Sequence, residues 1–193
     1  MRKKWRQGIF KPNNPKKFIG SKAIYRSGLE LKFFRFCDTN PNVIKWGSEN
    51  VVVPYRSPLD NKVHKYYVDN FVSIKENNKV SNYLVEIKPS KQTKPPQTKY
   101  RKKEHLLYEQ KMFLTNQAKW KAARQYCKKC GFTFIIITEK ELYQVRLERS
   151  LGDQIVKATG KPSTASAVRE ALHRWAGRTS PGGAAFPRTP LNL

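Results

Sequence analysis

Residues 64–88 read HKYYVDNFVSIKENNKVSNYLVEIK, and this stretch decides the fold. Two runs of β-branched and aromatic residues flank Asn77-Asn78, a dipeptide typical of turns. They predict strands over residues 64–74 and 80–88, joined as an antiparallel hairpin. Because side chains alternate along a strand, we expect the first strand to have one face with Tyr67, Asp69 and Phe71 and another with Tyr66, Val68 and Val72.

The register of this hairpin places two carboxylates together. A turn centred on residues 77 and 78 pairs residues whose numbers add up to 155, so Asp69 lies opposite Glu86 on one face. Lys88 stands two residues beyond Glu86 and shares that face, while Val85 and Ile87 point into the core. A slip of one residue would move Asp69 to the other face. The alternative interpretation is an exposed face with ordinary solvated charges.

Two opposed carboxylates repel each other, so a cation must offset the repulsion. Lys88 supplies part of this positive charge, and a divalent ion can supply more. Two carboxylates provide the hard oxygen ligands that suit Mg²⁺, an ion that also binds phosphate oxygens. Metal, carboxylates and lysine together can polarise a phosphodiester and generate a hydroxide nucleophile. The hairpin therefore indicates hydrolysis of a nucleic acid.

Cap signals set the ends of two helices. Ser27 followed by Glu30 is a capping box, which explains Glu30 without catalysis, and Asn40-Pro41 ends that helix. We expect a second helical stretch in two parts, with Thr115-Asn116 as an internal cap and Gly131 at its end. Helices and strands together predict a mixed α/β core, with elements at residues 27–40, 43–46, 51–55, 64–74, 80–88, 104–131, 132–138 and 139–149.

The composition indicates a polyanionic partner. The 193 residues include 39 Lys or Arg and 14 Asp or Glu, a formal net charge of +25. Nucleic acid is the first candidate and an anionic membrane the second. No apolar run is long enough to span a membrane, and no secretory signal is recognisable. Three cysteines in such a chain indicate reduced thiols in a cytosolic environment. Cys127 and Cys130 have zinc-ligand spacing but lack a second pair, so we expect Cys127 in the core.

The chain divides into three expected segments. Residues 1–22 hold eight Lys or Arg and no acid, which predicts a basic arm. Residues 23–149 form the folded domain. After Ser150 alanine, arginine, proline and glycine become frequent, which predicts an appended, weakly structured segment at 150–193 with one helix at 163–176.

A second concentration of positive charge follows the hairpin. From Lys88 to Thr138 there are thirteen Lys or Arg and two acids, a net charge of +11, which is more than solubility requires. Such residues contact phosphates and position a duplex without reading its sequence. The residues that we expect to bind DNA are Lys91, Lys94, Lys99, Arg101, Lys102, Lys103, Lys119 and Lys121.

Several motifs resemble a known nuclease superfamily. Asp69, then Glu86-Ile87-Lys88, preceded by a helical Glu30, resembles the PD-(D/E)XK signature, although Val68 stands where the name implies proline. More specifically the chain resembles the head-completion nucleases of large tailed bacteriophages, and its core is similar to the TnsA endonuclease subunit of transposons. The similarity covers about residues 10–148, through Tyr25-Arg26-Ser27-Gly28-Leu29-Glu30, Trp46-Gly47-Ser48-Glu49, Val53-Pro54-Tyr55, Val85-Glu86-Ile87-Lys88-Pro89, Lys119-Trp120-Lys121-Ala122-Ala123 and Ile137-Thr138-Glu139.

The resemblance implies a restriction-endonuclease-like fold, with a mixed central sheet flanked by helices in the order αβββαβ. It implies that Asp69, Glu86 and the backbone carbonyl of Ile87 bind Mg²⁺ or Mn²⁺, and that Glu30 completes the site. Lys88 is implied to orient or help deprotonate the attacking water and to offset negative charge in the transition state. Glu49 stays open between a polar residue that enters a strand and a member of the site.

By this resemblance the chain is a metal-dependent deoxyribonuclease with little sequence specificity, acting as an endonuclease, an exonuclease or both. It implies a role in phage head completion, DNA packaging and head–tail joining, in the host cytoplasm during assembly or at the virion neck. The expected partners are double-stranded DNA, portal or neck proteins and a second copy of the chain, and no membrane. Two alternatives are a TnsA-like transposon or repair endonuclease and a non-catalytic basic DNA-binding or capsid-joining protein.

Overall fold

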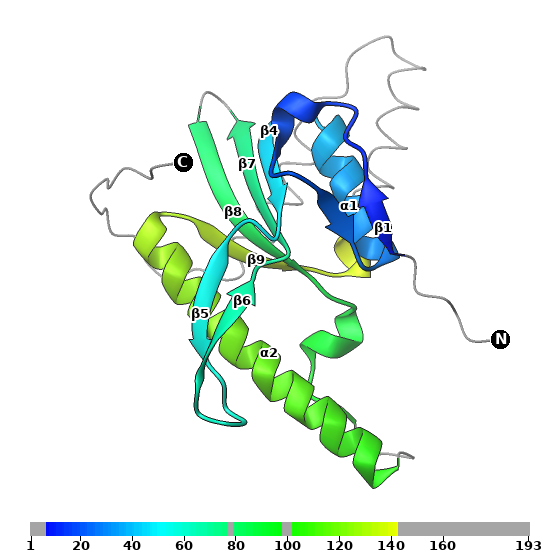
Figure 1. The fold of residues 1–193 in the computed structure, drawn as a ribbon, viewed down its shortest axis with the longest axis vertical. Helices are drawn as coiled ribbons and strands as arrows, with labels where there is room; N and C mark the ends of the chain where they lie inside the picture. Colours follow the sequence, from blue (N-terminus) through cyan, green and yellow to red (C-terminus); the bar gives the residue numbers. More distant parts are fainter. Residues whose placement is uncertain (1–6, 77–78, 98–101, 143–193) are drawn as a thin grey trace, which may run out of the picture.

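A mixed five-stranded sheet forms the centre of the computed structural model, which describes residues 7–76, 79–97 and 102–142 (Figure 1). The strand order is β2-β4-β7-β8-β9, with antiparallel pairs in the middle and parallel pairs at both edges. The expected mixed α/β fold with a restriction-endonuclease-like sheet is thus confirmed. The strands are β2 (Phe18–Ile19), β4 (Val43–Ser48), β7 (Asn70–Glu76), β8 (Lys79–Ile87) and β9 (Thr133–Ile137).

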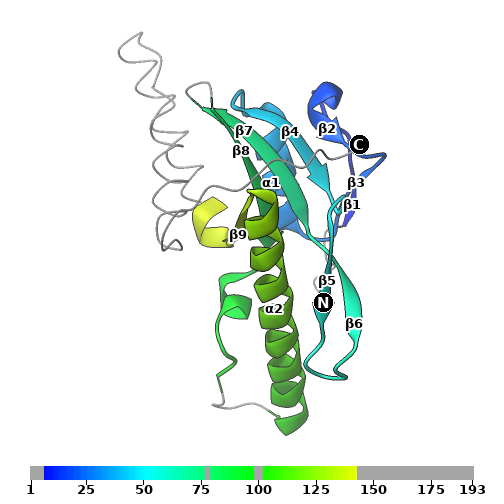
Figure 2. The same ribbon diagram turned by 90° about the vertical axis from the view of Figure 1, so that its left-hand side faces the viewer.

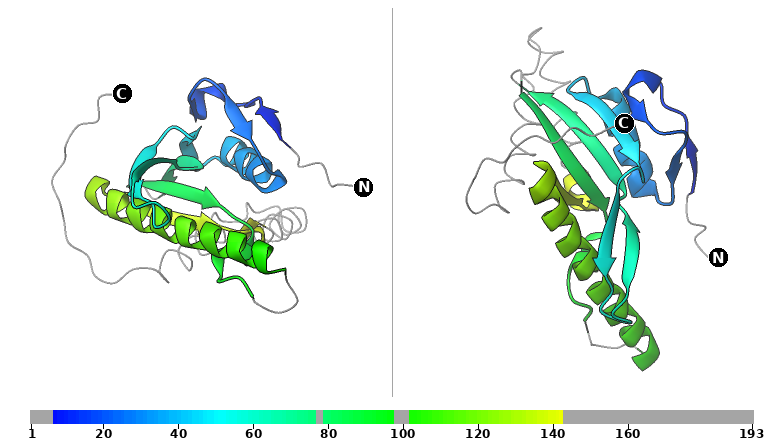
Figure 3. Two further views of the ribbon diagram at one scale, coloured as in Figure 1. Left: turned by 60° about the horizontal axis from the view of Figure 1, so that its bottom comes forward. Right: turned by 60° about the vertical axis from the view of Figure 1, so that its left-hand side comes forward.

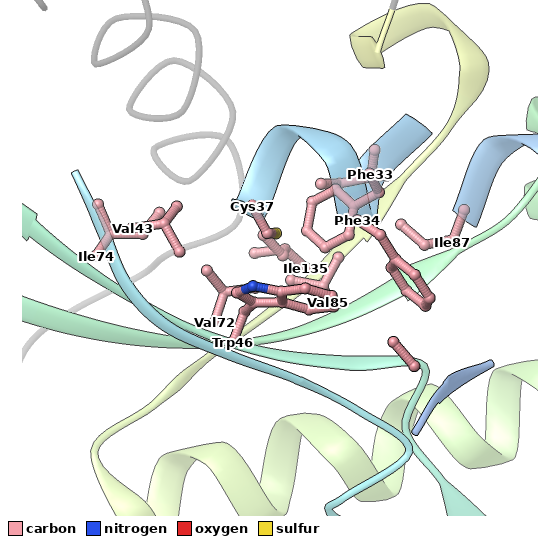
Figure 4. Packing of buried hydrophobic residues seen from close by; sticks show 12 residues of the cluster. Phe33, Phe34, Cys37, Val43, Trp46, Val72, Ile74, Val85, Ile87 and Ile135 are labelled. Atoms are coloured by element: carbon pink, nitrogen blue, oxygen red, sulfur yellow. The ribbon is translucent and has the colours of Figure 1, made fainter. Parts of the chain in front are cut away.

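Helices α1 (Gly28–Thr39) and α2 (Lys103–Cys130) cover opposite faces of this sheet (Figure 3). Each helix packs on its own group of buried side chains. The cluster under α1 (Figure 4) comprises Ala23, Phe33, Phe34, Cys37, Val43, Trp46, Val72, Ile74, Val85, Ile87, Ile135 and Ile137. The cluster under α2 comprises Val53, Tyr55, Tyr66, Val68, Leu84, Trp120, Ala123, Cys127 and Phe134. The β7–β8 hairpin therefore lies between two apolar layers, not at the protein surface.

The register of the central hairpin is the one that the sequence predicts. Asn70 pairs with Val85, and the ladder continues in the same register to Glu76 and Lys79. Val85 and Ile87 face α1, as expected. Register is strongly specified here because a slip of one residue would turn every apolar side chain to the wrong layer.

The expected single strand at 64–74 is wrong. It divides into β6 (Val63–Tyr67) and β7, because β6 leaves the central sheet and pairs with β5 (Val52–Arg56) in a separate two-stranded sheet. Simple alternation fails across this break. Tyr66 and Val68 lie in the cluster under α2 together with Phe71, and Val72 lies in the cluster under α1.

Helix α2 is one continuous helix of 28 residues, so the expected interruption at Thr115-Asn116 is wrong. The Thr115 hydroxyl donates to the Lys111 carbonyl within the helix at 2.9 Å, a bond that the helical backbone itself offers. Asn116 is a buried residue of this helix. The helix ends, as predicted, at Gly131 with a left-handed φ of 71°. With β5 and β6, its first half projects beyond the central sheet (Figures 1 and 2).

The N-terminal segment becomes part of the folded domain well before residue 22, where the expected basic arm ends. From Gln7 onward it contains β1 (Gly8–Phe10), a 3-10 turn at Pro15–Lys17 and β2, and β1 pairs with β3 (Ala23–Tyr25). The buried Asp38 carboxylate accepts hydrogen bonds from the N–H groups of Asn13 and Asn14, at 2.8 and 3.0 Å. These bonds fasten the segment to the end of α1.

Two other expectations concern segments that are described only partly or not at all. One helical turn begins at Glu139 and is described as far as Leu142, so the rest of the expected helix at 139–149 lies outside the described residues. Residues 1–6 of the basic arm and the whole appended segment 150–193, with its expected helix, also lie outside them. Within the described part of the chain, no helix has the length and apolar character to cross a membrane.

Candidate active site

Three side chains meet where the central hairpin opens. Asp69 stands in the bend between β6 and β7, and Glu86 and Lys88 stand at the end of β8. The Ile87 N–H donates to Asp69 Oδ2 at 2.8 Å, which holds this carboxylate against β8. Lys88 Nζ lies 3.0 Å from Glu86 Oε1 and 3.9 Å from Asp69 Oδ2. The structure thus brings together the two carboxylates and the lysine that the sequence predicts.

The charges in this group are strongly coupled. Burial and the neighbouring charge of Glu86 raise the pKa of Asp69 to about 7, against the opposing effect of Lys88. Burial alone would lower the pKa of Lys88, but the carboxylates of Asp69 and Glu86 outweigh it and raise that pKa. The lysine is therefore a cation, and it offsets only part of the repulsion between the two carboxylates.

Tyr66 is a neighbour of the site that the sequence analysis missed. Its hydroxyl donates to Glu86 Oε2 at 2.5 Å, and both side chains are buried. Burial, together with the charge of Glu86, raises the pKa of Tyr66 far above its ordinary value, so the phenol stays a donor. Each oxygen of Glu86 therefore has a donor, Lys88 on one side and Tyr66 on the other. No motif marked Tyr66; only the pairing of β5 with β6 turns it inward.

Glu30 lies at the edge of this group. One carboxylate oxygen accepts from the Ser27 hydroxyl at 2.8 Å, and the other accepts from the Arg26 N–H at 2.9 Å. The capping box therefore occupies both oxygens, although the charge of Glu30 is close enough to raise the pKa of Asp69. Within residues 7–76, 79–97 and 102–142, no three His, Cys, Asp or Glu side chains form a group that could hold a metal ion. Glu30 is thus not part of a three-carboxylate cluster.

Glu49 is close to the site through its backbone. Its N–H donates to the Asp69 carbonyl at 3.1 Å, and its carboxylate is paired with the guanidinium of Arg26. The sequence left its role open between a strand residue and a site residue. The structure places it after β4, directly beside the bend that carries Asp69.

The donor set fits a hard divalent cation. Asp69 and Glu86 offer carboxylate oxygens, and burial, together with the charge of Glu86 that Lys88 does not fully offset, raises the pKa of Asp69. A divalent ion would relieve this repulsion and would find the oxygen ligands that Mg²⁺ or Mn²⁺ prefers. Ile87, whose backbone carbonyl is the third expected ligand, stands between Glu86 and Lys88 at the end of β8.

The residues expected to bind DNA are spread along one stretch of the chain. Lys91 and Lys94 follow the site directly, in and after the 3-10 turn Ser90–Thr93, and both are exposed. Lys102 and Lys103 stand at the start of α2, Lys121 is exposed on the same helix, and Lys99 and Arg101 lie outside the described residues. Lys119 lies beside Tyr66, with its Nζ 5.5 Å from the centre of that ring.

The three cysteines do not pair with one another. Cys37 and Cys127 are buried, Cys130 is exposed, and all three are free thiols. Burial raises the pKa of Cys127 to about 12, which makes its thiolate form, the one that binds metal, unfavourable. Cys127 is a core residue under α2, as the sequence predicts.

Sequence comparison assigns this chain to one class of protein. Residues 40–139 match the family model of the N-terminal domain of TnsA-like endonucleases, and this range includes Asp69, Glu86 and Lys88. The chain belongs to this endonuclease family, and its role is that of a nuclease. The head completion nuclease of Enterobacteria phage T4 is 35% identical over 141 residues, which cover 70% of this chain and 92% of that protein. The suspected family is thereby confirmed.

Proposed function

We propose that this chain is a Mg²⁺-dependent deoxyribonuclease that hydrolyses phosphodiester bonds with little sequence preference during phage head completion. The observation that carries the proposal is the group formed by Asp69, Glu86 and Lys88, two carboxylates and a cation at the open end of one hairpin. The name of the T4 relative supports the setting in head completion. Portal or neck proteins and a second copy of the chain are further proposed partners.

The side chains divide the chemistry between them. Asp69 and Glu86, with the Ile87 carbonyl, would hold Mg²⁺, which would supply Lewis-acid polarisation of the scissile phosphate. The raised pKa keeps Lys88 protonated, and a general base must be deprotonated to accept a proton. We therefore assign to Lys88 the stabilisation of negative charge on the phosphate and the orientation of the attacking water, and not proton abstraction.

The basic surface supports DNA as the substrate. Lys91 and Lys94 follow Lys88 within a few residues and are exposed, so phosphates on either side of a scissile bond would meet cations close to the carboxylates. Contacts of this kind bind any sequence equally. For this reason we propose a nuclease with little sequence preference.

The experiment compares plasmid cleavage with Mg²⁺ and with a chelator for the wild type and the variants Asp69→Asn and Glu86→Gln. Each variant keeps size and hydrogen bonding but removes a charge that the metal needs, so we expect each substitution to abolish cleavage. DNA binding should be retained. Asp60→Asn is the control, because it removes one acid from an exposed pair with His64 in the β5–β6 loop.

Two results would contradict the proposal. Cleavage by both site variants at the wild-type rate would place the chemistry elsewhere in the chain. Equal DNA binding by the wild type with and without Mg²⁺, together with no cleavage under either condition, would favour the non-catalytic DNA-binding alternative. A melting curve of each variant, recorded first, separates loss of catalysis from loss of the fold.

A further inference from the structure

Arg26 and Glu49 form an ion pair beside the site, and nothing in the proposed chemistry uses it. Arg26 stands just before α1, and its backbone N–H donates to Glu30 Oε2 at 2.9 Å. Its guanidinium contacts the Glu49 carboxylate with both terminal nitrogens, Nη1 to Oε1 and Nη2 to Oε2 at 3.2 Å. The two side chains are 58% and 33% exposed, so the pair is open to solvent and to a ligand.

The backbone holds this pair close to the catalytic carboxylates. Glu49 has a φ of 53°, in the left-handed region, which costs a residue other than glycine about 1–2 kcal/mol. In that conformation its N–H reaches the Asp69 carbonyl at 3.1 Å. Arg26 is thus tied to Glu30 by its own backbone and to the Asp69 bend through Glu49. The hydrogen bond with Glu49 and the charges of Glu49, Glu30 and Asp69 raise the pKa of Arg26.

The stability that an exposed ion pair provides does not account for the left-handed conformation of Glu49. Pairs of this kind contribute about 0–1 kcal/mol to stability, which does not exceed the cost of a left-handed glutamate. A guanidinium, however, binds a phosphate with the same two-pronged geometry that it uses for a carboxylate. A phosphate that replaced Glu49 would therefore find a shaped, charged partner and displace only a weak one.

We propose that Arg26 binds a backbone phosphate of the DNA substrate and that Glu49 occupies its guanidinium until the DNA arrives. Glu49 is then neither a metal ligand nor a passive strand residue but a competitor for the phosphate. This inference rests on the proposed function in one respect, since it takes the ligand to be DNA. It adds a phosphate contact on the α1 side of the site, whereas the predicted basic residues lie on α2 and on the segment between β8 and α2.

The test measures binding of a short fluorescent DNA duplex in a chelator, where no cleavage interferes, for the wild type, Arg26→Ala, Glu49→Gln and the double variant. Arg26→Ala should weaken binding and lower the salt slope of log K by about 1, the value for one phosphate that the protein no longer neutralises. Glu49→Gln should tighten binding about 3- to 10-fold, roughly the 1 kcal/mol of a surface pair. In the double variant Glu49→Gln should have no effect, because the freed guanidinium is absent.

Two controls separate this competition from a general charge effect. Asp60→Asn removes one acid from another exposed pair and should leave binding within about 2-fold of the wild type. Arg26→Lys keeps the charge but loses the planar fork, so its affinity should lie between those of the wild type and Arg26→Ala. The melting temperatures of Arg26→Lys and Glu49→Gln verify that the fold is intact.

The outcomes distinguish this inference from the proposed function. Equal tightening by Glu49→Gln with and without Arg26, or unchanged binding by Arg26→Ala, would overturn the inference and leave the nuclease proposal standing. A different result would separate the two the other way. If Glu49→Gln tightens DNA binding only when Arg26 is present, but the wild type shows no Mg²⁺-dependent cleavage, the inference stands and the proposed function fails.

Discussion

At the scale of single residues, the site is defined by what surrounds Glu86. This carboxylate is 2% exposed, and a buried carboxylate needs hydrogen-bond donors to remain charged. Lys88 supplies one donor and Tyr66 the other. Removing a group that hydrogen-bonds a metal ligand commonly lowers metal affinity by about 10- to 100-fold. Tyr66 therefore acts through Glu86 as a positioning residue.

Tyr66→Phe should weaken Mg²⁺ binding by about 10-fold, because Glu86 Oε2 loses its donor and the carboxylate is free to turn. The measurement is a calorimetric titration with Mg²⁺ at constant temperature, whose midpoint gives the affinity and does not depend on cleavage. Tyr55→Phe is the matched control. Tyr55 packs edge-on against Tyr66, with ring centres 6.5 Å apart, and is also buried under Lys119.

The Tyr66 prediction can fail in a clear way. If Tyr66→Phe and Tyr55→Phe shift the Mg²⁺ midpoint equally, the tyrosine hydroxyl does not position Glu86. In a Glu86→Gln background, the effect of Tyr66→Phe on the midpoint should vanish, because the carboxylate through which it acts is gone.

The pH dependence of stability tests the charge on Asp69. Its pKa is about 7 in the folded protein and about 3.9 in an unfolded chain, so between these values the folded state binds more protons. Stability therefore falls as the pH rises from about 4 to 7, and the loss is complete above 7. Asp69→Asn removes this dependence. Its free energy of unfolding, relative to the metal-free wild type, should rise across that window in urea titrations with chelator.

A suitable control for the pH experiment is Glu139→Gln. Hydrogen bonds from the Ser90 hydroxyl and N–H lower the pKa of Glu139, so its contribution is lost only at acidic pH. Between pH 5 and 8 the difference between Glu139→Gln and the wild type should stay constant. A constant difference for Asp69→Asn as well would mean that Asp69 is charged throughout this range.

At the scale of elements, the end of α2 offers a clean test of backbone conformation. Gly131 has a φ of 71°, and a Cβ there would meet no atom within 4 Å. Gly131→Ala should therefore destabilise the protein by about 1 kcal/mol through backbone strain alone. Gly28→Ala, at the first position of α1 and equally free of contacts, should leave stability unchanged or raise it. Thermal unfolding of the two variants against the wild type measures this contrast.

The contrast between two elements explains how far the sequence could predict the structure. The β7–β8 hairpin was predictable to its register because an Asn-Asn turn fixes which residues face each other and both strands alternate. The break before Asp69 was not, since residues 64–67 alternate just as well in a strand of another sheet. Thr115-Asn116 suggested a cap because both residues favour helix starts, but Asn116 is buried and Thr115 bonds to the Lys111 carbonyl within one continuous helix.

The residues of the site also divide into those that the sequence predicts and those that it does not. Asp69, Glu86 and Lys88 were predictable because one hairpin holds all three. Tyr66 and the Arg26–Glu49 pair were not, because they reach the site through tertiary contacts between segments that no spacing relates. Positive φ at Glu49 has no signal in the sequence, since glutamate rarely adopts it.

At the scale of the whole molecule, binding to DNA should depend on where the positive charge lies as well as on its total of +25. Replacing Lys91 and Lys94 with glutamine should lower the salt slope of log K for duplex DNA by about 0.9 for each phosphate that these lysines neutralise. The matched control replaces Lys75 and Lys79, exposed residues at the turn end of the hairpin, away from the site. Fluorescence anisotropy over a series of salt concentrations gives both slopes.

An equal reduction of the slope by both pairs of substitutions would mean that DNA contacts no particular face of the protein. A reduction by Lys75 and Lys79 alone would place the duplex at the far end of the hairpin and separate it from the carboxylates. Either result would contradict the proposal that the DNA contacts Lys91 and Lys94 beside the carboxylates.

The carboxylates also come together over a short length of chain. The Ile87 N–H reaches Asp69 across 18 residues and Tyr66 reaches Glu86 across 20, whereas Ser90 meets Glu139 across 49. Closing a short loop costs less entropy than closing a long one, so near contacts tend to form before distant ones during folding. We therefore expect the two carboxylates to meet while water still surrounds them, before Ser90 reaches Glu139. On this expectation Asp69 keeps the ordinary acidity of an aspartate until later contacts bury it.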